Sequence, residues 1–189
     1  MKRPLWLLDV DGVLNALVDR LADTPYGSDR DWLRFHQRSR TDLLYPIVAN
    51  RRVLEFIREA HESGRAEVRW LTTWEVNDDY VALAESLGLP QFEIEARATD
   101  FTALGMLDYG MWWKLPAVER ALDREPGRPV LWTDDEVGLR TPAMRWQRRQ
   151  AETRPNLAVV APDLLVGLTP AHLAQIDGLL ADTERKADR

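Results

Sequence analysis

Apolar residues in this chain form short continuous runs that alternate with segments of helical periodicity. The runs predict five strands, the third of them weaker than the others, at residues 3–10, 66–74, 91–95, 128–135 and 156–162. Between and after them, apolar residues at three- and four-residue steps predict helices at about 51–63, 81–87, 113–124 and from 170 to about 181. This alternation predicts an α/β fold: a Rossmann-like, doubly wound and mostly parallel five-stranded sheet with helices on both faces.

Three regions depart from the alternation. Residues 13–49 contain no clear strand, and we expect a small cap or flap insertion that folds over one edge of the sheet. Residues 97–112 indicate a loop or a short helical excursion, and residues 182–189 a polar tail that frays. With 189 residues, the chain is expected to form a single domain, 1–189.

Composition narrows the class of protein further. The chain has no cysteine, which excludes disulfides, thiolate metal sites and a cysteine nucleophile. No stretch approaches the roughly 20 apolar residues of a membrane span. We therefore expect a cytoplasmic protein without a membrane partner. The net charge of -6 argues against non-specific binding to nucleic acid, although it says nothing about local basic patches.

Two of the apolar runs end in acids. Asp9 and Asp11 follow the first run, and Asp134 and Asp135 close the fourth. Parallel strands deliver their carboxyl ends to one edge of the sheet, where open α/β folds bind ligands. Four carboxylates gathered there would repel one another unless a cation joined them, and Mg²⁺ is the hard, oxygen-bound cation that fits best.

Each acidic pair has an ordinary alternative, because Asp and Asp-Gly are common in turns and helix caps. The occurrence of both pairs after strongly apolar strands favours the metal site. A calcium loop of the EF-hand type is excluded, since Leu14 and Arg20 occupy the places of its glycine and glutamate.

Two further side-chain types suit a phosphoryl group. The second predicted strand ends in WLTTW, where the hydroxyl of Thr72 or of Thr73 can contact a phosphoryl oxygen, although threonine at a strand end often has no function. Lys114 begins a helix, where the helix dipole disfavours a cation. Its position beside two tryptophans suggests a partner anion.

The order of these parts resembles the four motifs of the haloacid dehalogenase-like (HAD) phosphohydrolase superfamily. The resemblance rests on DVDGVLN after the first strand, a threonine after the second, a lysine at a later helix start and Asp-Asp after the fourth. It covers about residues 4–166 and implies a magnesium-dependent phosphatase acting on a phosphate monoester.

The resemblance also implies roles for these residues. Asp9 would attack phosphorus and become an aspartyl-phosphate, and Asp11 would protonate the leaving group and then deprotonate water. Thr72 and Lys114 would stabilise the transferring phosphoryl group. Mg²⁺ would be held by Asp9, the backbone carbonyl of Asp11, and Asp135, with Asp134 as a further ligand or a supporting group.

The substrate is less well defined. We expect Gly12, Thr73, Trp74 and Arg34 to contact it. Two groups of arginines could contact the phosphates of a nucleotide or a nucleic-acid end: Arg30, Arg34 and Arg38, which share one face if their segment is helical, and Arg145, Arg148, Arg149 and Arg154. Trp74 or Trp112 could stack on a base. WLTTW and GLTPAHL weakly resemble HAD domains of nucleic-acid end repair, but arginines on solvated faces and tryptophans in the core are the more ordinary explanation of these residues.

Two other functions remain open. A phosphorylation-receiver domain also groups acids, threonine and lysine on a parallel sheet, although its acids precede the lysine, whereas Asp134 and Asp135 follow Lys114. A non-catalytic nucleic-acid-binding module would keep the arginines and use no phosphate chemistry. The oligomeric state has no signal in the sequence.

Overall fold

A computed structural model describes residues 2–18, 24–26, 29–102, 112–139, 144–146, 149–150 and 153–187. Its main sheet is five-stranded and parallel, in the order β5-β4-β1-β6-β7. The strands are β1 (Leu5–Leu8), β4 (Glu67–Trp70), β5 (Glu93–Ile94), β6 (Val130–Thr133) and β7 (Leu157–Val160). The predicted doubly wound α/β sheet is confirmed.

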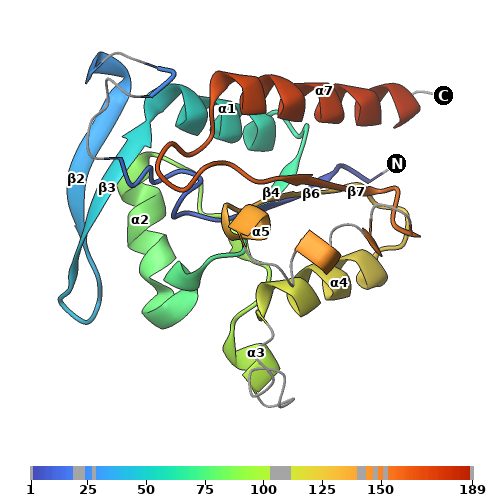
Figure 1. The fold of residues 1–189 in the computed structure, drawn as a ribbon, viewed down its shortest axis with the longest axis horizontal. Helices are drawn as coiled ribbons and strands as arrows, with labels where there is room; N and C mark the ends of the chain where they lie inside the picture. Colours follow the sequence, from blue (N-terminus) through green and yellow to red (C-terminus); the bar gives the residue numbers. More distant parts are fainter. Residues whose placement is uncertain are drawn as a thin grey trace.

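Helices pack on both faces of the sheet (Figure 1). Their bounds are α1 (Arg51–Glu62), α2 (Asp79–Leu87), α3 (Thr99–Thr102), α4 (Lys114–Arg124), α5 (Glu136–Leu139) and α7 (Pro170–Ala187), with 3-10 turns η2 (Asp29–Asp31) and η3 (Thr73–Asp78). Among the described residues, no helix combines the length and the apolar character that crossing a membrane requires.

The central strand β1 divides the core in two. Trp6 and Leu8 pack into one apolar cluster with residues of α1, α2 and α7, whereas Leu5 and Leu7 pack into another with residues of α4 and α5. Successive side chains of a strand point to opposite faces, so a strand covered on both sides must be apolar throughout. This is why the run before Asp9 is continuous rather than alternating.

Helix α1 begins and ends as its sequence predicts. The Asn50 side chain caps it by accepting a hydrogen bond from the backbone N–H of Arg52 at 3.0 Å. Val53, Leu54, Ile57 and Ala60 are buried against the sheet. Gly64, with φ of 78°, follows the helix in the left-handed conformation that glycine adopts most readily.

The insertion after β1 contains two strands, which corrects the prediction for residues 13–49. Strands β2 (Trp32–Arg38) and β3 (Leu44–Asn50) pair antiparallel as a separate sheet, which we call the hairpin. Arg34 and Arg38 therefore lie on one face of a strand, not of a helix, because alternate strand residues share a face. Polar residues on β2 and Pro46 on β3 obscured the strand pattern in the sequence.

Of the two other regions that depart from the alternation, residues 97–112 agree with the prediction in part and the C-terminal segment does not. Residues 97–112 include α3, which agrees with a short helical excursion, while residues 103–111 lie outside the described part of the chain. Helix α7 continues to Ala187, so the prediction of a frayed tail after Ala181 is wrong for this segment. Arg65 holds the helix through Asp177 at 2.8 Å and Glu184 at 2.9 Å.

Candidate functional site

The strand order places the acids that follow β1 next to those that follow β6. From β1 the chain proceeds to β4 and β5 on one side of the sheet and then crosses to β6 and β7 on the other. The carboxyl ends of β1 and β6 are therefore neighbours at the point where the strand order reverses, the usual ligand site of such sheets. The backbone N–H of Asp9 donates to the carbonyl of Thr133 at 3.1 Å, which fixes this proximity.

Three carboxylates converge at that point, and we call Asp9, Asp134 and Asp135 the acidic cluster. One oxygen of each lies within 4.8 Å of the others, and all three residues are buried. Lys114, only 1% exposed at the start of α4, donates from Nζ to Oδ2 of Asp9 at 2.6 Å and to Oδ2 of Asp134 at 2.7 Å. The position of Lys114 in the sequence suggests an anionic partner, and the structure places the carboxylates of Asp9 and Asp134 there.

The charges of this site do not balance. Burial opposes the charged form of Lys114, but the carboxylates of Asp9 and Asp134 outweigh it and hold the pKa of Lys114 above its ordinary value. Burial, and then the charge of Asp9, raise the pKa of Asp135 to about 6. Burial also raises the pKa of Asp134, despite the opposing charge of Lys114. One ammonium group cannot neutralise three carboxylates, so negative charge is in excess among the described residues of this site.

This excess is the reason that the acidic cluster fits a divalent cation. Carboxylate oxygens are the ligands that Mg²⁺ prefers, and a cation would offset the burial and the charge of Asp9, which together raise the pKa of Asp135. The donor set is therefore chemically suited to the ion that the sequence predicts.

Gly12 permits the loop after β1 to approach the acidic cluster closely. Its φ is +67°, and a Cβ built on it would lie 2.7 Å from Oδ1 of Asp135 and nearer still to Cγ. Any other residue would push Asp135 away or displace the loop. The structure thus gives Gly12 a role in spacing, and its predicted contact with substrate stays a prediction.

Asp11 stands apart from the acidic cluster and is partly exposed. Asn15 Nδ2 donates to its Oδ1 at 2.9 Å, and Trp74 Nε1 donates to its Oδ2 at 2.9 Å. A carboxylate can accept about four hydrogen bonds, so these two fix the orientation of Asp11 and leave lone pairs for a further partner.

The two threonines after β4 separate into different environments. Thr72 is fully buried, and its Oγ1 accepts a hydrogen bond from the backbone N–H of Trp74 at 3.3 Å, which caps η3. Thr73 is exposed and lines a cavity. Which hydroxyl contacts a phosphoryl oxygen stays a prediction.

That cavity, of about 480 Å³, opens beside Asp11 and is here called the hairpin cavity. The hairpin forms one wall, and η3 with the start of α2 forms the other. The residues lining it are Asp11, Thr41, Leu43, Tyr45, Thr73, Trp74, Val76, Asn77 and Asp79. Of the four acids that follow the two apolar runs, Asp11 is the one that lines this cavity.

Several residues that the sequence suggested for nucleic-acid contact lie elsewhere. Arg34 is exposed on β2 and is not part of the cavity lining. Trp112 is buried, with Lys114 Nζ 5.4 Å from its ring centre and Trp132 packed 5.5 Å away, so it does not offer a free face to a base. Arg154 pairs with Asp123 at 2.6 Å, and Arg148 lies outside the described residues.

Two residues that sequence reasoning missed join the hairpin to the site. Oδ1 of Asn15 accepts a hydrogen bond from the backbone N–H of Val48 at 2.8 Å, and its Nδ2 donates one to Asp11. Asn15 therefore links β3 to the loop after β1. Tyr45 packs edge-on against Trp74 with ring centres 5.2 Å apart. The run DVDGVLN includes Asn15, but no local signal in the sequence marks Tyr45.

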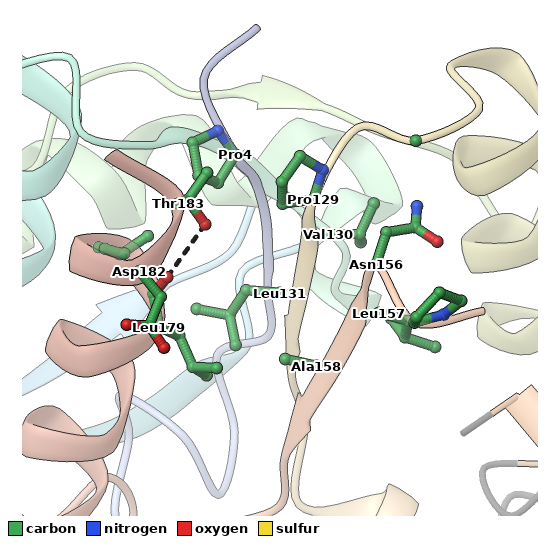
Figure 2. A pocket seen from close by; sticks show the side chains of 13 residues that line it. Pro4, Pro129, Val130, Leu131, Asn156, Leu157, Ala158, Leu179, Asp182 and Thr183 are labelled. Atoms are coloured by element: carbon green, nitrogen blue, oxygen red, sulfur yellow. Dashed lines mark hydrogen bonds between the residues drawn. The ribbon is translucent and has the colours of Figure 1, made fainter. Parts of the chain in front are cut away.

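A second cavity, of about 520 Å³, lies at the opposite edge of the sheet, at the amino ends of β1, β6 and β7 (Figure 2). It is lined mainly by apolar residues such as Pro4, Pro129, Leu157 and Leu179, and the acidic cluster takes no part in it. Its chemistry is therefore separate from that of the carboxylates.

Comparisons of this chain with protein families, with curated proteins and with solved structures find no match.

Proposed function

We propose that this protein is a magnesium-dependent phosphatase that hydrolyses a phosphate monoester through an aspartyl-phosphate on Asp9. The observation that carries the proposal is the convergence of Asp9, Asp134 and Asp135 around Lys114 at the point where the strand order reverses, beside a cavity lined by Asp11. The resemblance of the motifs to the HAD superfamily supports the same reaction.

Each step uses a residue of this site. A carboxylate oxygen of Asp9 forms a bond to phosphorus, and the bond from phosphorus to the ester oxygen breaks. Asp11 gives the leaving oxygen its proton, then takes one from the water that attacks the same phosphorus. Phosphate leaves and Asp9 is regenerated. Lys114 stabilises negative charge beside the attacking carboxylate.

Asp9, Asp134 and Asp135 would hold Mg²⁺. The ion supplies positive charge that offsets the charge of the transferring phosphoryl group. Thr72 or Thr73 would contact that group as the sequence predicts.

The proposal is tested by phosphate release from a panel of monoesters, each assayed with Mg²⁺ and with chelator. We expect release only with Mg²⁺, and loss of roughly 10⁴-fold or more in kcat for Asp9→Asn, because the nucleophile is removed. Asp123→Asn, an exposed carboxylate paired with Arg154, is the matched control and should keep full activity.

Two outcomes would overturn the proposal. An active Asp9→Asn variant with an unchanged circular dichroism spectrum would remove Asp9 from the reaction. A stable phosphorylated protein that does not turn over would favour a phospho-acceptor domain instead.

A further inference from the structure

We infer that the hairpin cavity is a subsite for an uncharged leaving group that carries an aromatic ring, so the substrate is a small aromatic phosphate monoester rather than a nucleic-acid end. The inference rests on the proposed phosphatase function and defines the substrate of that same site. Its basis is the position, the ring content and the charge of the cavity.

The position of the cavity follows from Asp11. This carboxylate lines the cavity and lies two residues after Asp9, the proposed nucleophile. A leaving group whose oxygen takes a proton from Asp11 must extend away from the acidic cluster, and the cavity of about 480 Å³ is the space that Asp11 faces. Ligand sites of small molecules typically have volumes of about 300 to 1,000 Å³.

Aromatic and apolar side chains form much of the wall. Trp74 is held in place by its hydrogen bond to Asp11 and by Tyr45, whose ring meets it edge-on. Trp74 is only 7% exposed, whereas Tyr45 is 40% exposed, so Tyr45 is the more accessible of the two aromatic residues. Leu43 and Val76 add exposed apolar surface on either side.

Strand geometry explains why these residues share the cavity. Leu43 precedes β3 and Tyr45 lies on it, two residues apart, and both line the cavity, whereas Leu44 between them does not. Alternate residues of an extended chain point to the same side. Leu44 is 54% exposed and belongs to the opposite side of the hairpin, which makes it a natural control.

The charge of the cavity disfavours polyanions. Asp11 and Asp79 contribute carboxylates, and none of the described residues that line the cavity is a lysine or an arginine. Asp79 Oδ1 accepts a hydrogen bond from the backbone N–H of Arg40 at 2.8 Å, so the hairpin tip holds this carboxylate in place. A chain of phosphodiesters would meet negative charge without compensation.

Three substrates isolate the ring and the charge. Ribose 5-phosphate carries the ester alone, adenosine 5′-monophosphate adds an uncharged ring, and a 5′-phosphorylated dinucleotide adds one phosphodiester anion. We expect kcat/KM for adenosine 5′-monophosphate to exceed that for ribose 5-phosphate by at least about five-fold, as stacking on an aromatic ring would give. The dinucleotide should fall below adenosine 5′-monophosphate.

Variants at the wall decide whether the cavity is responsible. Tyr45→Ala should abolish the preference for the ring, measured as the ratio of kcat/KM for adenosine 5′-monophosphate to kcat/KM for ribose 5-phosphate, while Tyr45→Phe and the control Leu44→Ala should keep that ratio. Asp79→Asn should narrow the gap between the mononucleotide and the dinucleotide. A preference for the dinucleotide, or an unchanged preference in Tyr45→Ala, would overturn the inference.

A binding measurement separates this inference from the reaction. Adenosine, the dephosphorylated product, should bind in chelator by titration calorimetry, and Tyr45→Ala should lose that binding. If no ester releases phosphate, the proposed function fails, yet adenosine binding that depends on Tyr45 would still support the subsite. Phosphate release without any binding of adenosine would overturn the subsite alone.

Discussion

The carboxyl and amino edges of the sheet shift the pKa values of their acids in opposite directions. At the carboxyl edge, the acidic cluster shares one ammonium group, and the pKa of Asp135 rises to about 6. At the amino edge, Glu67 at the start of β4 accepts hydrogen bonds from Arg128 at 2.6 Å and from Arg69 at 2.7 Å. Burial there would raise the pKa of Glu67, but the two arginines outweigh it and lower the pKa to about 2.

The two edges differ in how far the described residues neutralise their carboxylates. Guanidinium groups that match a carboxylate in number and geometry satisfy it, so nothing further need bind. The acidic cluster lacks such partners among the described residues and keeps an excess of negative charge. A fold tolerates this cost where a cation or a reacting group supplies the missing charge.

Removing the ammonium group of Lys114, which hydrogen-bonds to the acidic cluster, should have the largest effect. Lys114→Met leaves Asp9 and Asp134 buried without their ammonium partner, and breaking a buried ion pair in this way costs about 3–5 kcal/mol. We expect that loss in the free energy of unfolding, measured by urea denaturation in chelator. Saturating Mg²⁺ should then restore part of it, because the ion replaces the lost positive charge.

Arg128→Met is the matched control at the amino edge. It also breaks buried ion pairs, but its carboxylate partners Glu67 and Glu125 remain partly open to water, so the loss should be smaller. Mg²⁺ should not restore it. Equal behaviour of the two variants toward Mg²⁺ would remove the distinction between the edges.

The closeness of Gly12 to Asp135 gives an intermediate effect. Gly12→Ala introduces a Cβ against the buried carboxylate and an alanine at φ of +67°. Left-handed backbone costs roughly 1–2 kcal/mol for a residue with a Cβ, and overpacking adds about 1–3 kcal/mol. The free energy of unfolding should fall by roughly the sum of the two, and Mg²⁺ affinity should fall with it.

Gly88→Ala measures the backbone part of that loss alone, and the difference between the two variants gives the steric part. Gly88 has the same φ of +67°, but no atom lies within 4 Å of the Cβ it would gain. Only the backbone cost should appear there, with no change in Mg²⁺ affinity. If both alanines cost the same, Asp135 moves aside freely and is not held by the loop after β1.

The sequence was sufficient to place the acidic cluster but not its surroundings. Asp9, Asp134 and Asp135 follow apolar strands, and a parallel sheet leaves one edge for their side chains. Lys114 required an anion by its helix position, but its partner Asp9 lies 105 residues away, and only the fold pairs them. Strand β2 was missed because half-exposed strands carry arginines as readily as helices do. Tyr45 was missed because its contact with Trp74 depends on how the hairpin lies across η3.

Neutralising one acid at each edge should change stability by smaller amounts and in opposite directions. The ordinary pKa of Glu67 is 4.5 and its folded pKa about 2, so its ionised form stabilises the protein above pH 4.5, and this contribution is lost as pH falls toward 2. The pKa of Asp135 rises from 3.8 to about 6, so its ionised form destabilises the protein above pH 6. This destabilisation is lost as the pH falls below 6 and the carboxyl group takes up a proton.

At pH 7 in chelator, Glu67→Gln should lower the free energy of unfolding by roughly 2 kcal/mol, and Asp135→Asn should raise it by about 1 kcal/mol. With saturating Mg²⁺, Asp135→Asn should lower the free energy of unfolding instead, because the substitution then removes a ligand of the ion, whereas the effect of Glu67→Gln should not change sign. If both variants lose stability in chelator, the acidic cluster does not carry an excess of negative charge.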